Sequence, residues 1–354
     1  MTETSQTELF PIVLLDNMAY AYGQPQFSAK FKQSPEDFQV NETLSFDIEG
    51  EGTHAYLYIR KTDTNTQWLA KQLANFSGIP VRDVGYAGLK DRHAVTRQWF
   101  SINLEGIEEP DWQQLDIPGI AIEQHRYHKR KLKTGAIAHN EFIIQLKALS
   151  KDAKPTLIES LEKIKQQGVP NYFGSQRFGI DNGNLTKAKA WFSGQRKVKR
   201  REEKSIYLSA SRSMLFNHLL SLRINEYGWN QLVEGEVMML DGSHAVFKTE
   251  ELDNELQERF DKADIHPTIC LWGRGEPSSN SKINQLELSL RDNFSDWCQT
   301  LENKGLKQER RSIRLIPQNL QYQFQDDNSL KLQFNLPTGS YATALLRELV
   351  TVYG

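Results

Sequence analysis

The segment GYAGLKDRHAVTRQWF, residues 85–100, concentrates the residue types that are best suited to chemistry. Four ionisable side chains follow one another in a turn between two predicted strands: Lys90, Asp91, Arg92 and His93. Turns that serve only the backbone more often carry Asn, Gly or Ser, whereas catalytic side chains commonly lie on loops held by a rigid sheet. A single ionised carboxylate can act as a nucleophile or as a base. Asp91 is therefore the first catalytic candidate.

The basic residues are distributed unevenly, although the net charge is only −2. They gather in three segments: RYHKRKLKTG, RKVKRREEK and KQERRSIR. A basic patch acts within about one Debye length, roughly 8 Å at physiological salt, so its position counts more than the net charge. One such segment is usually a solvated face, but three favour a polyanionic partner. In the first segment we expect phosphate contacts from Lys129, Arg130, Lys131 and Lys133.

The composition predicts a folded protein, because 38% of the residues are hydrophobic and 25% are charged. No apolar run approaches the roughly 18 residues of a membrane span, and the first residues do not resemble a signal peptide. Cys270 and Cys298 are too few and too isolated for a zinc site or a disulfide framework. We therefore expect reduced, buried cysteines in a cytoplasmic protein that has no membrane partner and no metal site.

Hydrophobic spacing predicts strands in the first and last parts of the chain and helices in the middle. The segment 55–60 is expected to form a half-exposed strand, and Thr64 or Asn65 is expected to cap a helix that ends at Gly78. Further expected elements are a helix opened by Pro155, a helix capped by Ser209 and closed by Gly228, a hairpin at Asp241-Gly242, and a last helix at 342–349.

The simplest architecture is α+β, with a mixed or antiparallel sheet. Strand-like texture at both ends of the chain predicts one domain built from residues 1–165 and 315–354. The intervening residues, 166–314, are predicted to form a mostly helical α+β insertion domain.

Four segments of this chain resemble the signature segments of the TruD-type tRNA pseudouridine synthases: AGLKDRHAVTRQWF, HKRKLKTGAIAHNEF, PNYFGSQRFG and LPTGSYATALLREL. The resemblance extends from about Phe38 to Leu349. It implies a pseudouridine synthase domain interrupted by a TruD-type insertion domain. It further implies an isomerase of tRNA processing that converts the uridine at position 13, in the D arm, and requires neither a metal nor an organic cofactor. No obligatory protein partner is expected.

The resemblance also assigns roles to individual residues. Asp91 falls on the catalytic aspartate of a Gly-x-Lys-Asp element, and Lys90 falls on the lysine beside it. Asn140 and Phe142 match an Asn-x-Phe element, in which the aromatic ring is expected to stack on the target base. The other matches, with candidate roles in substrate binding, are Phe38 and Glu42 of a Phe-x-Val-x-Glu element, and Arg177 of the motif Gly174-Ser175-Gln176-Arg177-Phe178.

The residue types fit the implied reaction. Pseudouridine formation breaks a carbon–nitrogen glycosidic bond, turns the uracil and rejoins it through carbon, so one carboxylate suffices. A hydrolase, which uses water as acceptor, would need two carboxylates. Asp91 can attack the anomeric carbon or deprotonate C2′, and both routes remain open. A cation beside Asp91, from Lys90 or Arg177, would favour its charged form.

Two other classes of protein share some of these features. An RNA-binding or RNA-folding protein without catalysis would also carry basic clusters, and Asp91 would then only pair with Lys90 in a surface turn, a contact worth about 0–1 kcal/mol. A tRNA methyltransferase is disfavoured, because no Gly-rich loop follows a strand with a distal acidic residue. The combination of Asp91, Asn140 and Phe142 favours the enzyme.

Overall fold

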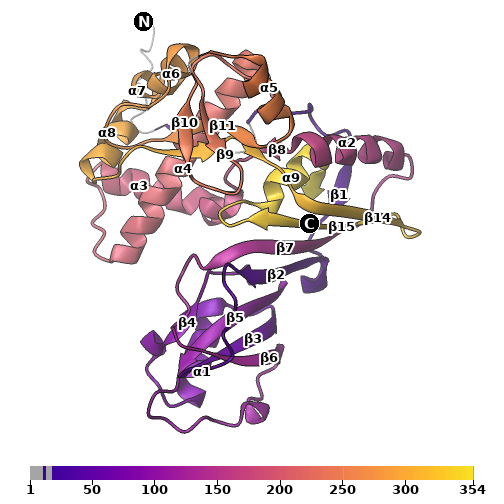
Figure 1. The fold of residues 1–354 in the computed structure, drawn as a ribbon, viewed down its shortest axis with the longest axis vertical. Helices are drawn as coiled ribbons and strands as arrows, with labels where there is room; N and C mark the ends of the chain where they lie inside the picture. Colours follow the sequence, from indigo (N-terminus) through magenta and orange to yellow (C-terminus); the bar gives the residue numbers. More distant parts are fainter. Residues whose placement is uncertain (1–10, 13–17, 250, 354) are drawn as a thin grey trace, which may run out of the picture. The chain divides into compact units, whose positions relative to one another are not determined.

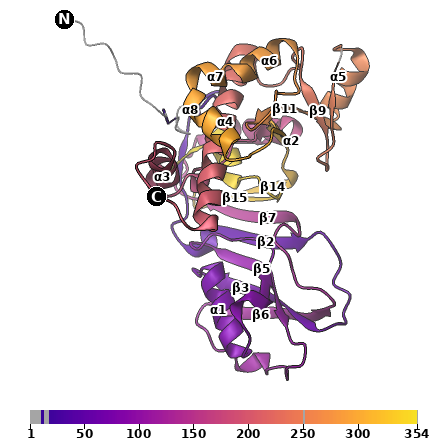
Figure 2. The ribbon, with the colours of Figure 1, turned by 90° about the vertical axis from the view of Figure 1, so that its left-hand side faces the viewer.

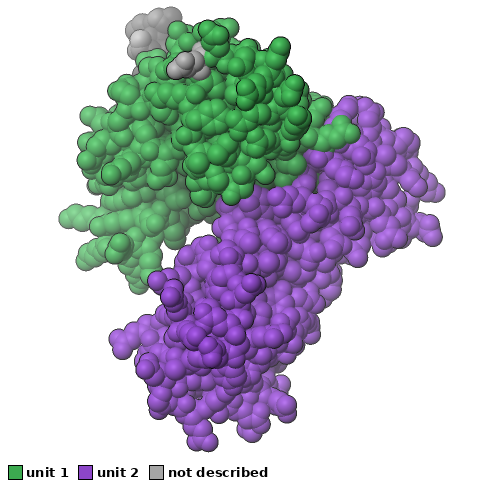
Figure 3. All heavy atoms as spheres, in the orientation of Figure 1, with its two compact units in different colours: residues 1–24, 166–316, 340–348 green, residues 25–165, 317–339, 349–354 purple. Residues whose placement is uncertain are grey.

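The computed structural model describes residues 11–12, 18–249 and 251–353. The chain forms two compact units, which Figure 3 shows in different colours. Unit 1 contains Met1–Gln24, Gln166–Ile316 and Ser340–Glu348, and unit 2 contains Pro25–Lys165, Pro317–Gly339 and Leu349–Gly354. The division into a catalytic domain and an insertion domain at 166–314 stays a prediction.

Unit 2 is built on an eight-stranded sheet with the order β14-β15-β7-β2-β5-β3-β6, in which β4 also pairs with β5 (Figure 1). The strands are β2 (Phe38–Leu44), β3 (His54–Thr62), β4 (Val84–Tyr86), β5 (Val95–Asn103), β6 (Ile120–His128), β7 (Ile137–Leu146), β14 (Gln318–Gln325) and β15 (Ser329–Pro337). All pairs are antiparallel except β2 with β5. A separate parallel pair joins β1 (Ser28–Lys30) to β16 (Thr351–Tyr353). The predicted α+β class with a mixed sheet is confirmed.

Helix α1 (Thr66–Phe76) lies beside the sheet of unit 2 (Figure 2). Asn65 caps it, because the side-chain oxygen accepts hydrogen bonds from the backbone of the second and third residues after it, at 2.9 and 3.1 Å. Its apolar side buries Leu69 and Leu73 against β3 and β5. The chain leaves the helix through Gly78, at φ +67°. The predicted cap and end of this helix are confirmed. The second helix of the unit, α2, spans Ala153–Gln167.

The expectation that strand 55–60 is half-exposed is confirmed for β3 at Tyr58 and Arg60, which are part-buried, but it was wrong at Tyr56. Tyr56, placed on the exposed face by its alternation with Leu57, is fully buried. Its ring packs against Phe46 and Trp99, and its hydroxyl donates to the Arg130 carbonyl at 2.8 Å. Chain segments from elsewhere cover this face of the sheet, which the period-2 pattern of one strand cannot reveal.

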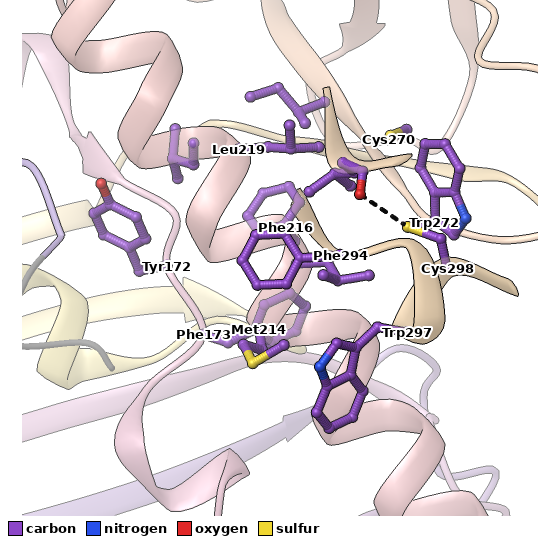
Figure 4. Packing of buried hydrophobic residues seen from close by; sticks show 14 of the residues in the cluster. Tyr172, Phe173, Met214, Phe216, Leu219, Cys270, Trp272, Phe294, Trp297 and Cys298 are labelled. Carbon is purple, nitrogen blue, oxygen red and sulfur yellow. Dashed lines mark hydrogen bonds between the residues drawn. The ribbon is translucent and has the colours of Figure 1, made fainter. Parts of the chain in front are cut away.

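Unit 1 has its own core, around the long helix α4 (Arg201–Tyr227) and a four-stranded sheet with the order β10-β9-β11-β12. Figure 4 shows the core packing of Phe216, Phe294 and Trp297. Cys270 and Cys298 are buried free thiols, as predicted, and the Cys298 thiol donates to the Leu290 carbonyl at 3.6 Å.

The strands of the unit 1 sheet are β9 (Val237–Leu240), β10 (Val246–Lys248), β11 (Ile265–Leu271) and β12 (Glu309–Ser312). The helices are α3 (Gly183–Phe192), α5 (Asn254–Asp261), α6 (Ser281–Leu288), α7 (Leu290–Asn293) and α8 (Ser295–Asn303).

Helix α4 begins nine residues earlier than expected, because its N-cap is Arg200 and not Ser209. Ser209 is not its cap but lies inside it, and the first helical residue is Arg201. Glu202 and Glu203 in the first turn favour this start, because acidic side chains interact well with the positive end of the helix dipole. Gly228, at φ +78°, ends the helix as predicted. The second basic segment is therefore partly helical.

A short strand pair and one C-terminal helix belong to unit 1 or to its boundary. β8 (Val169–Pro170) pairs antiparallel with β13 (Arg314–Leu315), and α9 spans Ala342–Leu349. The predicted hairpin is present, with Val246 of β10 opposite Met239 of β9. No helix in the described part of the chain combines the length and apolar character needed to cross a bilayer.

Candidate active site

A buried ion pair between Lys90 and Glu42 anchors the turn that carries Asp91. Glu42 and Asn140 lie opposite each other where β2 pairs with β7. The Lys90 ammonium lies 2.7 Å from Glu42 Oε2 and donates to Asn140 Oδ1 at 2.6 Å. Glu42 Oε1 also accepts the backbone N–H of Trp99 at 3.2 Å. The side chains of Lys90 and Glu42 are 5% and 0% exposed, so this contact is well shielded from solvent.

A second set of contacts holds the backbone of the turn. The Lys90 N–H donates to Thr66 Oγ1 at 3.2 Å, at the start of α1. The Thr66 hydroxyl in turn donates to Gln98 Oε1 at 2.9 Å, and the Gln98 amide donates to the Gly88 carbonyl at 3.2 Å. The helix and β5 therefore hold the backbone that enters the turn, at Gly88 and Lys90, by hydrogen bonds.

Asp91 itself lies at the surface, and its side chain is 35% exposed. Its Oδ1 accepts the backbone N–H of His93 at 3.1 Å, while Oδ2 pairs with the Lys32 ammonium. The idea that Lys90 is the cation paired with Asp91 was therefore wrong, because the Lys90 side chain points to Glu42 and Asn140. Lys32 was not identified from the sequence, since it lies 59 residues away and only the fold brings it close.

An aromatic row lies next to these residues on the sheet. Phe142 stacks on Phe334 with a centroid distance of 5.7 Å and contacts Phe38 at 6.0 Å. Phe142 is 8% exposed, so only a small part of its ring is open to a base. The Lys32 ammonium lies over the Phe38 ring, 4.1 Å from its centroid, in a cation–π contact. Phe38 thus supports the lysine that pairs with Asp91.

Lys61, on β3, is a further buried cation that sequence reasoning missed. It is fully buried, and its ammonium donates to the Thr64 carbonyl at 2.7 Å. Burial, with the positive charge of Lys90 adding to it, lowers the pKa of Lys61 to about 8, and the charge of Asp91 opposes this shift. The alternation of residues along β3 did not indicate that the Lys61 side chain would be buried.

Arg177 belongs to unit 1, where it has its own partners. It lies in a short 3-10 helix, Ser175–Arg177. Its Nε donates to the Tyr341 hydroxyl at 2.8 Å, its Nη1 donates to Ser209 Oγ at 3.2 Å, and its guanidinium lies 5.6 Å from the Phe173 ring centroid. The role of Arg177 in substrate binding stays a prediction.

The four predicted phosphate-binding residues differ in their surroundings. Lys129 lies 3.5 Å from Glu49 and 2.5 Å from Glu51, and the hydrogen bond to Glu51 raises the pKa of Lys129. Two carboxylates therefore already balance its charge. Arg130 and Lys133 are exposed, while the exposed Lys131 donates from its ammonium to the Arg82 carbonyl.

The sequence matches the model of the family described as tRNA pseudouridine synthase D (TruD) over residues 15–188 and 183–349. This chain belongs to the tRNA pseudouridine synthase D family. The family member of Hydrogenovibrio crunogenus is 42% identical over 341 residues, which cover 96% of this chain and 98% of that one. The family member of Methylococcus capsulatus is 44% identical over 339 residues, covering 95% and 94%. The predictions of the family and of the enzyme class, an isomerase, are confirmed.

The fold also has a counterpart among solved structures. The crystal structure of a Methanosarcina mazei protein assigned to tRNA pseudouridine synthase D superposes with a TM-score of 0.69. The two sequences are 20% identical, and the match covers 94% of this chain and 95% of that one. At this identity the likeness concerns the fold, which extends over nearly the whole chain.

Proposed function

We propose that this protein isomerises uridine to pseudouridine in tRNA, at position 13 of the D arm, with Asp91 as its catalytic carboxylate and without a cofactor. The observation that carries the proposal is the setting of Asp91. It is a part-exposed carboxylate on a turn that buried contacts of Lys90 with Glu42 and Asn140 hold in place. Catalysis needs a reactive side chain that substrate can reach and that a rigid framework holds in place.

The reaction balances without an outside reagent. The bond between C1′ and N1 breaks, the uracil turns, and a bond forms between C1′ and C5. The hydrogen on C5 leaves as a proton, and N1 takes up a proton. Asp91 acts either by attacking C1′, so that the sugar is held covalently while the base turns, or by removing the proton from C2′. Both routes need an ionised carboxylate, and the Lys32 ammonium forms an ion pair with Asp91 Oδ2.

The other residues have supporting roles in this proposal. Lys90, Glu42 and Asn140 position the turn, and Phe38 supports Lys32. Phe142 offers an aromatic surface to the target base once a small movement exposes more of its ring, and base stacking of this kind stabilises binding by about 1–3 kcal/mol. Arg177, Arg130 and Lys133 contact the RNA. The cytoplasm is the proposed location, and the isolated chain is proposed to suffice for activity.

The test is incubation of the purified protein with unmodified tRNA transcripts, followed by carbodiimide-based mapping of pseudouridine. We expect one modified uridine, at position 13, for the wild type and none for Asp91→Asn. Wild-type protein that binds tRNA but modifies no uridine would favour the alternative, an RNA-binding protein without catalysis. Modification elsewhere in the tRNA would contradict only the proposed D-arm target.

A further inference from the structure

Unit 2 contains a hollow of about 730 Å³ between the outer side of α1 and the segment 131–134. Its volume is within the range of about 300–1,000 Å³ that is usual for ligand sites. Four of its lining side chains are cationic, two are aromatic, and none of the lining residues is acidic. We call this hollow the basic groove, defined by Trp68, Lys71, Arg82, Tyr86, Lys131 and Lys133.

We propose that the basic groove binds an RNA segment with at least one unpaired base, whose phosphates contact the lysines and whose base stacks on Trp68. This proposal rests on the proposed function, for which RNA is the substrate, and adds a binding site to it. The indole of Trp68 lies on the solvent side of α1, where the residue is 46% exposed. An exposed aromatic ring among cations is the combination by which proteins bind single-stranded nucleic acid.

The groove is a built feature rather than a chance gathering of lysines. Its wall at 131–134 is anchored by buried Leu132, whose N–H donates to Ser101 Oγ at 2.9 Å, and by the Gly135 N–H, which donates to the Ala87 carbonyl at 2.8 Å. On the neighbouring strand β4, position 85 must be glycine, because a Cβ there would lie 2.5 Å from the Leu132 carbonyl oxygen. These contacts hold Lys131 and Lys133 opposite α1.

Three cations of the groove, Lys71, Lys133 and Arg82, are available to a ligand, while the Lys131 ammonium donates to the Arg82 carbonyl. Among the described residues, neither Lys71 nor Lys133 lies within ion-pair distance of a carboxylate. Arg82 has a loose contact, 4.0 Å, with Asp83, and its side chain is 84% exposed. Lys129 provides the contrast, because Glu49 and Glu51 already pair with it. Of the segment 129–133, Arg130, Lys131 and Lys133 therefore remain as candidates for the expected phosphate contacts, together with Lys71 and Arg82.

A second hollow of unit 2 argues for selectivity by charge. It has nearly the same volume, about 740 Å³, but its lining includes Glu109, Asp111 and Glu123. An anionic RNA is repelled from this acidic hollow and attracted to the basic groove. The position of the basic groove fits the proposed reaction, because strand β4, which lines it, leads directly into the turn that carries Asp91.

The test is the affinity for an unmodified tRNA transcript as a function of salt concentration. We expect Lys71→Ala/Lys133→Ala to lower the slope of log K against log salt by about two, one for each lost phosphate contact. Trp68→Ala should weaken binding about 5- to 100-fold without changing the slope, and Trp68→Phe should restore most of the affinity. With a fully paired RNA duplex, Trp68→Ala should have no effect, because no base is free to stack.

The matched control is Lys151→Ala/Lys165→Ala, which removes two exposed cations from the same unit, one just before helix α2 and one in its last turn. Groove variants that bind tRNA with the affinity and slope of this control would overturn the proposal, as would an equal loss for Trp68→Ala on paired and unpaired RNA. Melting temperatures show whether each variant is folded. Failure of the proposed function is distinguishable, because it appears as absent uridine isomerisation by the wild type, whatever the groove variants do.

Discussion

Lys90 and Glu42 form an ion pair of 2.7 Å that is almost wholly buried, one residue before the part-exposed Asp91. A buried pair of this kind contributes little net stability compared with apolar residues, but removal of one partner leaves an uncompensated charge. The pair therefore fixes one arrangement of the turn rather than simply strengthening the fold. This arrangement also includes Asn140, whose amide oxygen accepts from the same ammonium.

The first prediction concerns this pair. Lys90→Met should lower the free energy of unfolding by about 3–5 kcal/mol, because it leaves the Glu42 carboxylate buried without its cation. Lys90→Met/Glu42→Gln should be less destabilised than the sum of the two single variants, by about 0.5–3 kcal/mol. Urea denaturation of the four proteins measures this. Additive effects would show that the two side chains do not depend on each other.

The second prediction is that Asp91→Asn separates catalysis from folding. Oδ1 of asparagine can still accept the His93 N–H, and the lost pair with Lys32 is solvent-exposed enough to contribute only about 0–1 kcal/mol. The melting temperature should hardly change, and tRNA affinity should stay within a few-fold. Turnover, measured as tritium release from 5-tritiated uridine in tRNA, should fall below detection. Residual activity above about one per cent, a loss of less than about 2.7 kcal/mol, would remove Asp91 from its role.

The third prediction concerns Lys32 as a positioning residue. Lys32→Met should lower kcat about 10- to 100-fold with a smaller change in KM, because the carboxylate of Asp91 loses the partner that orients it. Lys32→Arg should keep most of the activity, since it keeps the charge. Lys30→Met is the control, because it removes an exposed cation from the same segment. Equal kcat values for Lys32→Met and Lys30→Met would contradict the role.

The fourth prediction is a pH dependence that originates from Lys61. Its pKa is about 8 in the folded protein and near 10.5 in the unfolded chain. Between these values the unfolded state binds more protons, so stability rises with pH. Below pH 8 the folded state contains a buried ammonium, which is destabilising by about 3 kcal/mol.

Lys61→Met removes this titration. The unfolding free energy of the variant minus that of the wild type should therefore be most positive below pH 8 and should decrease toward pH 10.5. Urea denaturation at pH 7, 9 and 10.5 measures it. A difference that stays constant over this range would show that Lys61 keeps its ordinary pKa when folded.

Much of the local structure could be predicted from the sequence, because local structure depends on local side chains. Asn65 and Gly78 bound a helix by capping and by the left-handed backbone that glycine adopts. The same reasoning failed at Ser209, because a serine inside a long helix has the same residue type as a cap, and the actual N-cap, Arg200, makes no side-chain cap hydrogen bond. The family, and with it the candidacy of Asp91, also followed from contiguous segments of sequence.

The environment of the candidate site was decided by the tertiary structure. Strand periodicity indicates which side chains share a face, but not which strand lies beside which. The pairing of β2 with β7 places Glu42 opposite Asn140, and only this register lets Lys90 contact both. The approach of Lys32 to Asp91 depends in the same way on contacts between residues far apart in sequence. The sequence alone therefore determined which carboxylate to consider, and the packing of distant segments decided which cation pairs with it.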